Sequence, residues 1–218
     1  MKKQFIILSL ISFIIITISC KEENKVLLFN GENLENWEIF VPDSGAVPEE
    51  LFWVEDGLIQ VAGIPDGYIR TKETYSNFKL HVEWRWVSEP KNSGVLLHIN
   101  GENKLWPNCI EAQLANQNAG DLVPIQPGAG VTVDGTEYLL ENDSIWYIII
   151  PKMHESSENA PGEWNAYDIL CSGSDIELTV NGVLQNKGTN ATLTSGSIGV
   201  QSEGGPMEFR NIWLEPLE

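Results

Sequence analysis

Apolar and polar side chains alternate with a period of two between residues 77 and 114, and this alternation is what most restricts the fold. In the segment 77–87, one face of an extended strand would carry Phe78, Leu80, Val82, Trp84 and Trp86, and the other Lys79, His81, Glu83 and Arg85. Residues two apart share a face only in a β-strand. We therefore expect this stretch to form strands of a sheet that buries one face.

Short strands are also predicted along the rest of the chain, while helical periodicity is nearly absent. They lie at 37–40, 51–54, 57–61, 67–70, 93–100, 109–115, 145–151, 163–171, 175–181, 196–202 and 206–214. Asp56-Gly57 and Asn181-Gly182 are hairpin-type turns between such runs. This pattern indicates an all-β fold, a two-sheet antiparallel sandwich of jelly-roll type. The Asn-, Gly- and Pro-rich stretch 115–130 is predicted to be a long loop.

The first nineteen residues have the pattern of a secretory leader rather than of a folded domain. A charged start is followed by the apolar run Phe5 to Ile16, and Ile18-Ser19-Cys20 resembles a bacterial lipobox, in which the cysteine is lipidated. An uncleaved membrane anchor is the alternative, but spanning a bilayer takes about 20 apolar residues. We expect a leader at 1–19, a tether at 20–25 after lipidated Cys20, and one sandwich domain at 26–218.

The charge of the mature chain restricts its partners. Removal of residues 1–19 takes away two lysines and no acids, which leaves 11 basic and 31 acidic residues, a net charge of −20. Nucleic acid and anionic lipid are therefore not expected as partners, and the membrane is expected only through the lipid on Cys20. Residues 21–24 resemble the acidic export tag of Bacteroidota surface lipoproteins. We expect an outer-membrane-anchored protein, periplasmic or surface-exposed, and predict no oligomeric state.

The two remaining cysteines, Cys109 and Cys171, both lie in apolar strand-like runs. An oxidising compartment would allow a disulfide between them. Buried free thiols are the equal alternative.

A polar wall is predicted from the alternation in the two strands between residues 92 and 114. One face would hold Val95, Leu97, Ile99, Ile110, Ala112 and Leu114, and the other His98, Glu111 and Gln113. Glu83 and Arg85 would extend the polar face on a neighbouring strand. A carboxylate such as Glu111 in an otherwise apolar strand needs a partner or a function, so the wall is where chemistry is expected.

Eight short motifs occur in a fixed order over nearly the whole mature chain. They are Leu28-Phe29-Asn30-Gly31 with Leu34 and Trp37, Phe52-Trp53-Val54-Glu55-Asp56-Gly57, Asn77-Phe78-Lys79-Leu80 leading to Glu83, Asn92-Ser93-Gly94, Ile110-Glu111-Ala112-Gln113, Gly162-Glu163-Trp164-Asn165, Val180-Asn181-Gly182, and Gly196 to Leu214 with Phe209-Arg210-Asn211-Ile212. In this order and spacing the chain resembles the 3-keto-disaccharide hydrolase domain family, also described as 3-keto-glucoside lyase/hydratase.

The resemblance implies a concanavalin A-like lectin/glucanase sandwich and a small carbohydrate substrate, a glycoside already oxidised at C3. It also implies cleavage by elimination of the C1 substituent followed by addition of water. Many relatives carry a histidine after a Gln-Asp pair near the C-terminus, where this chain has Gln201-Ser202-Glu203-Gly204. Glu203 would have to replace that histidine.

Such a reaction needs a base near C2, a donor at the ketone oxygen and an acid for the departing oxygen. We assign the base to His98 or Glu111, the enolate contact to Arg85, Gln113 or a cation, and the acid to Glu83 or Glu203. Asn92 is expected to bind substrate, and Trp106 to stack on a sugar face. A structural ion pair of Glu83 with Arg85, and a structural His98, are the alternatives.

A metal ion and two other functions stay open. Glu83, His98 and Glu111 offer donors that suit calcium or manganese, although the sequence contains no compact metal motif. A lectin-like domain would need aromatics and amides but no acid and base. A retaining glycosidase would need two carboxylates about 5–5.5 Å apart, and the laminarinase-type Glu-x-Asp-x-x-Glu motif is absent.

Overall fold

The computed structural model describes residues 24–218 of the chain. The predicted leader, Cys20 and most of the tether lie outside the described residues and stay predictions. Within the described part, no helix is both long enough and apolar enough to cross a membrane.

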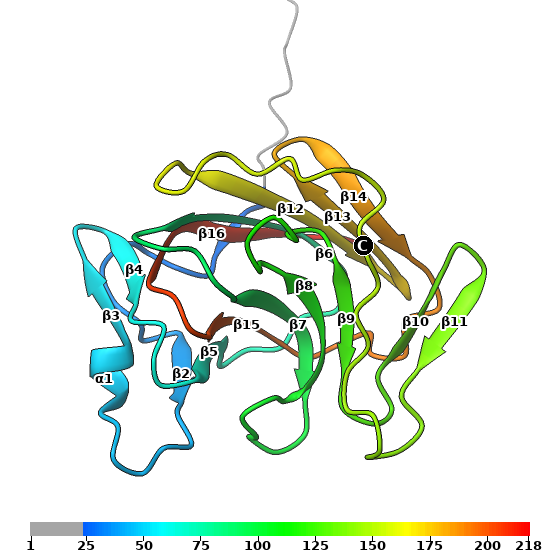
Figure 1. Cartoon of the computed structure of the whole chain (residues 1–218), viewed down its shortest axis with the longest axis horizontal. Coiled ribbons are helices and arrows are strands. Elements are labelled where there is room, and N and C mark those ends of the chain that lie inside the picture. Colours follow the sequence, from blue (N-terminus) through cyan, green and yellow to red (C-terminus); the bar gives the residue numbers. More distant parts are fainter. Residues whose placement is uncertain (1–23) are drawn as a thin grey trace, which may run out of the picture.

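Two antiparallel sheets pack face to face, as the alternation predicted (Figure 1). The eight-stranded sheet contains β14 (Val183–Gly188), β13 (Asp175–Val180), β12 (Asn165–Ser172), β6 (Phe78–Trp86), β16 (Met207–Pro216), β4 (Leu58–Val61) and β3 (Phe52–Glu55) in that order, with β1 (Val26–Leu27) beside β16. The six-stranded sheet contains β2 (Trp37–Phe40), β5 (Gly67–Thr71), β15 (Ser197–Ser202), β7 (Gly94–Asn100), β8 (Asn108–Gln113) and β9 (Leu122–Ile125). A separate hairpin pairs β10 (Gly130–Val133) with β11 (Thr136–Leu139), and α1 (Pro48–Leu51) is a single helical turn.

The hydrophobic core lies between the two sheets and is built from alternate residues of each. Val82 and Trp84 of β6 belong to the same cluster as Val95 of β7 and Ile110 and Ala112 of β8, and all five are completely buried. Because side chains alternate across a strand, the residues between them point away from the core. This places Glu83 on the outer face of the eight-stranded sheet and Glu111 on the outer face of the six-stranded sheet.

Strand β7 departs from simple alternation at His98. The residue has a positive φ of 53°, and the pairing of β7 with β8 shifts register between Leu97 and Asn100. Such a bulge reverses the faces of the residues that follow it. The prediction that Ile99 shares the core face with Val95 is therefore wrong: Ile99 packs with Leu96 in a cluster on the outer face.

Three further expectations need correction. The stretch 115–130 is not a continuous loop, because it contains β9, the edge strand of the six-stranded sheet. The stretch 145–151 forms no regular strand; it pairs with β9 through the isolated bridges of Tyr147 with Ile125 and Ile150 with Leu122. Cys109 and Cys171 are free buried thiols, one in each sheet, so the disulfide alternative is wrong.

Candidate functional site

Glu111 lies in the middle of β8 on the outer face, with Leu96 and Val123 beside it on the neighbouring strands. Its side chain is buried, and its Oε1 has no hydrogen-bond partner among the described residues. Burial raises the pKa of Glu111 well above its usual range; the charge of Glu203 acts in the same direction, and the Gln201 amide partly opposes them. Burial of this kind favours the protonated, uncharged form of the carboxyl group.

Gly94 of β7 makes room for Glu111. A Cβ on Gly94 would overlap Glu111 Oε1 and would lie 2.7 Å from Gln201 Oε1. Both side chains therefore lean over the same backbone position. Gln201 Oε1 is also buried without a hydrogen-bond partner in the described structure. Two unpaired oxygens above one glycine leave acceptor positions for the hydroxyl groups of a ligand.

Gln113 supplies donors on the same strand. Its Oε1 accepts hydrogen bonds from the backbone N–H groups of Leu114 (2.9 Å) and Ala115 (2.8 Å). These two bonds fix the orientation of the side-chain amide, so its NH₂ group is the part left for a ligand. Gln113 lines the same cavity as Glu111.

Glu203 provides a second carboxyl group at the cavity, just beyond the end of β15. Burial raises its pKa, a hydrogen bond from the Asn92 side chain lowers it, and the charge of Asp66 raises it again. Asn92 pairs with Glu203 through a backbone bridge, which holds the two residues side by side. Asn92 Oδ1 is a third buried oxygen that has no partner within residues 24–218.

The other end of the cavity is aromatic. The cavity has a volume of about 350 Å³ and is lined by Asn92, Trp106, Glu111, Gln113, Val123, Ile125, Trp146, Tyr147, Ile149, Gln201 and Glu203. The rings of Trp106 and Trp146 are nearly parallel, with an interplanar angle of 10° and centroids 6.4 Å apart. The Trp146 and Tyr147 ring centroids are 4.4 Å apart, and both side chains are about two-fifths exposed (41% and 42%). The cavity is thus polar at its buried end and apolar at its mouth.

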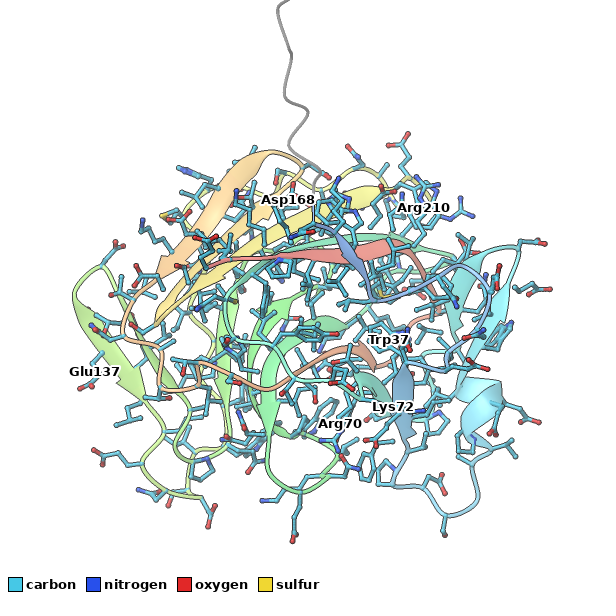
Figure 2. The ribbon with its side chains drawn as sticks, turned by 180° about the vertical axis from the view of Figure 1, so that it is seen from behind. Trp37, Arg70, Lys72, Glu137, Asp168 and Arg210 are labelled. Atoms are coloured by element: carbon cyan, nitrogen blue, oxygen red, sulfur yellow. The ribbon has the colours of Figure 1, made fainter. Side chains whose placement is uncertain are left out.

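The prediction that Glu83 and Arg85 share a wall with Glu111 is wrong. Glu83 accepts hydrogen bonds from Arg210 (2.6 Å) and Asn211 (2.7 Å) on the outer face of the eight-stranded sheet, and Arg85 pairs there with Glu208. Figure 2 shows Arg210 on this face and Arg70 of the six-stranded sheet on the opposite side of the molecule. Strands β6 and β8 belong to different sheets, and both direct their apolar residues into the core between the sheets. Their polar residues therefore point away from each other.

His98 is also not at the cavity. The bulge in β7 turns its ring to the inner side, where it packs edge-on against Phe78 with centroids 5.5 Å apart. Its ring nitrogens lie 3.0 Å from Leu193 O and 3.2 Å from Ser76 O, and burial lowers its pKa. His98 therefore has the surroundings expected of a structural histidine, which was the alternative to a catalytic role.

The predicted cation ligands do not come together. Glu83 lies on the outer face of the eight-stranded sheet, Glu111 on the outer face of the six-stranded sheet and His98 on its inner side, so these three side chains do not form one cation site. Among the described residues, no group of three or more His, Cys, Asp or Glu side chains is arranged to hold a metal ion.

Five predicted residues do line one cavity: Asn92, Trp106, Glu111, Gln113 and Glu203. Sequence reasoning missed Gln201, Trp146 and Tyr147. Gln201 had a usable signal, because it alternates with Val200 in a predicted strand. The two aromatics did not, since the apolar run 145–151 is typical of a buried strand.

Solved structures of similar architecture support the two-sheet fold. A provisionally named glycosyl hydrolase from Parabacteroides distasonis superposes with a TM-score of 0.66 at 23% identity, over 94% of this chain and 99% of that one. A Bacillus licheniformis β-glucanase gives 0.57 at 13% identity, covering 88% and 97%. A Bacillus subtilis carbohydrate-binding module gives 0.51 at 10% identity, covering 81% and 93%.

The sequence itself identifies the family. No curated protein matches the chain. The profile of the family described as 3-keto-alpha-glucoside-1,2-lyase-like domain, however, matches residues 24–215, almost all of the part that the structure describes. The chain belongs to the 3-keto-alpha-glucoside-1,2-lyase-like domain family.

Proposed function

We propose that this protein cleaves glycosides carrying a ketone at C3, by elimination at C1 and subsequent addition of water. The observation that carries the proposal is the presence of two carboxyl groups, Glu111 and Glu203, with different surroundings in one cavity. Paired carboxyl groups whose surroundings separate their pKa values can divide the roles of acid and base.

In the proposed elimination, Glu203 is the base and Glu111 is the acid. The ketone acidifies the C2 proton, and the Glu203 carboxylate accepts that proton. The C1–O bond breaks as a C1=C2 double bond forms, and protonated Glu111 donates its proton to the departing oxygen. Glu111 suits the acid role because it is the more buried of the two carboxyl groups, and burial favours the protonated form. A positioned acid or base contributes about 10²- to 10⁴-fold to the rate.

The enolate that forms on the ketone oxygen needs a hydrogen-bond donor. Gln113 suits this role, because its oxygen is already bound to the backbone of residues 114 and 115 and its NH₂ group stays available. A donor fixed in place before the reaction stabilises developing charge without reorganisation.

The second half of the reaction reverses the proton transfers. Water adds to C1, which is conjugated with the ketone, Glu111 accepts a proton from the water, and Glu203 returns a proton to C2. The sum is hydrolysis, with the released alcohol and a 3-keto sugar as products. Both carboxyl groups end in their starting protonation states.

The test is to incubate the purified protein with a methyl glucoside and with its 3-keto derivative, using both anomers, and to follow sugar release. Cleavage of the keto form alone supports the proposal. Cleavage of the plain glycoside would instead indicate a glycosidase, and binding of either sugar without turnover a lectin-like module.

A pair of variants tests the site. We expect Glu111→Gln to lower the rate of keto-glycoside cleavage by about 10²-fold or more. Glu83→Gln is the matched control, because it changes a carboxylate on the opposite face of the sandwich, and it should retain the rate. Full activity in Glu111→Gln, with the fold intact, would refute the assignment.

A further inference from the structure

The mouth of the cavity differs in chemistry from its buried end. Its lining consists of Trp106, Trp146, Tyr147 and Ile149, above the buried Val123 and Ile125 of β9. The polar atoms on these side chains are the Tyr147 hydroxyl and the two indole N–H groups. No lysine or arginine is among the described residues that line the cavity.

The two tryptophans are held by one residue, Gln126, which directly follows β9. Its side-chain amide donates a hydrogen bond to Trp106 O (3.0 Å), and its backbone N–H donates to Trp146 O (2.7 Å). Gln126 has a positive φ of 71°, which lets the backbone and the side chain reach two different segments. Both segments that carry the tryptophans are therefore anchored through their main chains to the residue that follows β9.

We propose that Trp106, Trp146 and Tyr147 form a binding subsite for the leaving group, and that this subsite selects planar aromatic aglycones. The proposal rests on the proposed function, since it assigns the leaving group to the mouth and the keto sugar to the polar end. Nearly parallel indole rings and an adjoining phenol offer faces on which an aryl group stacks.

A second sugar or an anionic leaving group fits the aromatic mouth of the cavity less well than an aryl group does. A sugar ring stacks on aromatic faces, but its hydroxyl groups also need hydrogen-bond partners. The side chains that offer several such partners are all at the polar end. An anionic leaving group would enter a cavity that contains the Glu203 carboxylate and, among the described residues that line it, no basic side chain to offset that charge.

The test compares phenyl and cyclohexyl 3-keto-glucosides, which have similar size but differ in aromaticity, by equilibrium binding to the Glu111→Gln protein. Binding is measured by calorimetry and by quenching of tryptophan fluorescence. We expect the phenyl compound to bind about fivefold to tenfold more tightly. Adding Trp146→Ala should reduce this ratio to about one.

Ile145→Ala is the matched control, because Ile145 is exposed in the same segment but does not line the cavity. It should leave the ratio unchanged. Gln126→Asn keeps the backbone hydrogen bond, but its shorter side chain cannot reach Trp106 O, so we expect a ratio between those of the parent and of Trp146→Ala.

The inference is overturned if the parent protein shows no preference for the phenyl compound, or if Trp146→Ala keeps the preference. It is also overturned if Ile145→Ala loses the preference to the same extent as Trp146→Ala. The ratio is measured without turnover. A preference that depends on Trp146 would therefore stand even if the unmodified protein failed to cleave any keto-glycoside, and a cleaving enzyme without the preference would refute the subsite alone.

Discussion

At the scale of single residues, the raised pKa of Glu111 links folding stability to pH. In the unfolded chain this carboxyl group titrates near 4.5, while in the folded protein it keeps its proton to higher pH. Above pH 4.5 the folded state therefore binds more protons than the unfolded state, and stability falls as the pH rises toward the folded pKa. We expect Glu111→Gln to remove this part of the slope. The difference in Tm between variant and parent, measured from pH 4.5 to 8, should grow in favour of the variant.

Gly94 gives a second prediction at this scale. A Cβ there would overlap Glu111 Oε1, so Gly94→Ala has to displace the carboxyl group. We expect a loss of about 1–3 kcal/mol in the free energy of unfolding, typical of overpacking, and a fall of at least about tenfold in keto-glycoside cleavage. Gly45→Ala is the control, because its Cβ would meet only Asp43 Oδ1 at 3.4 Å. Unchanged cleavage in Gly94→Ala would show that the position of Glu111 is not critical.

At the scale of single elements, the bulge in β7 decides which residues reach the cavity. The His98 ring packs against Phe78, and a neutral imidazole donates one hydrogen bond to Leu193 O or Ser76 O. We therefore expect His98→Ala to lower the free energy of unfolding by about 1–3 kcal/mol through lost packing and the loss of this hydrogen bond. Keto-glycoside cleavage should change by less than about twofold. His98→Asn, which tolerates a positive φ, should recover part of the stability. Urea unfolding with kinetics on the same samples separates the two roles, and a large fall in kcat at full stability would restore His98 as a catalytic candidate.

Strand positions could be predicted from the sequence wherever one face of a strand is buried and the other is polar. Alternation in 77–87 placed β6 within a residue at each end, and that in 93–100 and 109–115 found β7 and β8 to within two residues. The reversal at Ile99 could not be predicted, because a bulge depends on the pairing partner rather than on the strand's own pattern. Strand β9 was missed because Pro124 and the surrounding Gly and Asn residues are typical of a loop, yet an edge strand tolerates proline.

At the scale of the whole molecule, the sandwich has two outer faces and polar residues lie on both of them. Only part of the site could therefore be predicted. Alternation identifies the polar side of each strand, but sheet membership decides whether two polar sides meet. Glu111 and Gln113 share β8 and were correctly expected to lie together; Glu83 and Arg85 have the same pattern on β6, which joins the other sheet. On that face Arg210 and Arg85 lie over Trp164, 3.9 Å and 4.7 Å from the ring centre. Glu83 and Arg85 of β6 thus pair with residues of β16 on their own face of the sandwich.

The net negative charge of the whole molecule should affect how it binds charged substrates, which is the last prediction. The chain has a net charge of −18, and the cavity lining includes the Glu203 carboxylate but, among the described residues, no lysine or arginine, so the field at the mouth should repel an anionic leaving group. The Debye length is about 30 Å at 0.01 M salt and about 3 Å at 1 M, so salt should relieve this repulsion. We expect the KM for a 4-carboxyphenyl 3-keto-glucoside to fall several-fold between these salt concentrations, while the KM for the neutral phenyl compound stays nearly constant.

Ile145→Lys offers the matched charge variant, because Ile145 is 62% exposed beside Trp146 and outside the cavity lining. A positive charge at this point should lower the KM for the carboxyphenyl compound at low salt and flatten its salt dependence. The phenyl compound should respond to neither change, since it carries no charge for the field to act on. If salt instead changed the KM of both compounds equally, the effect would be general and repulsion at the cavity mouth would not be its cause.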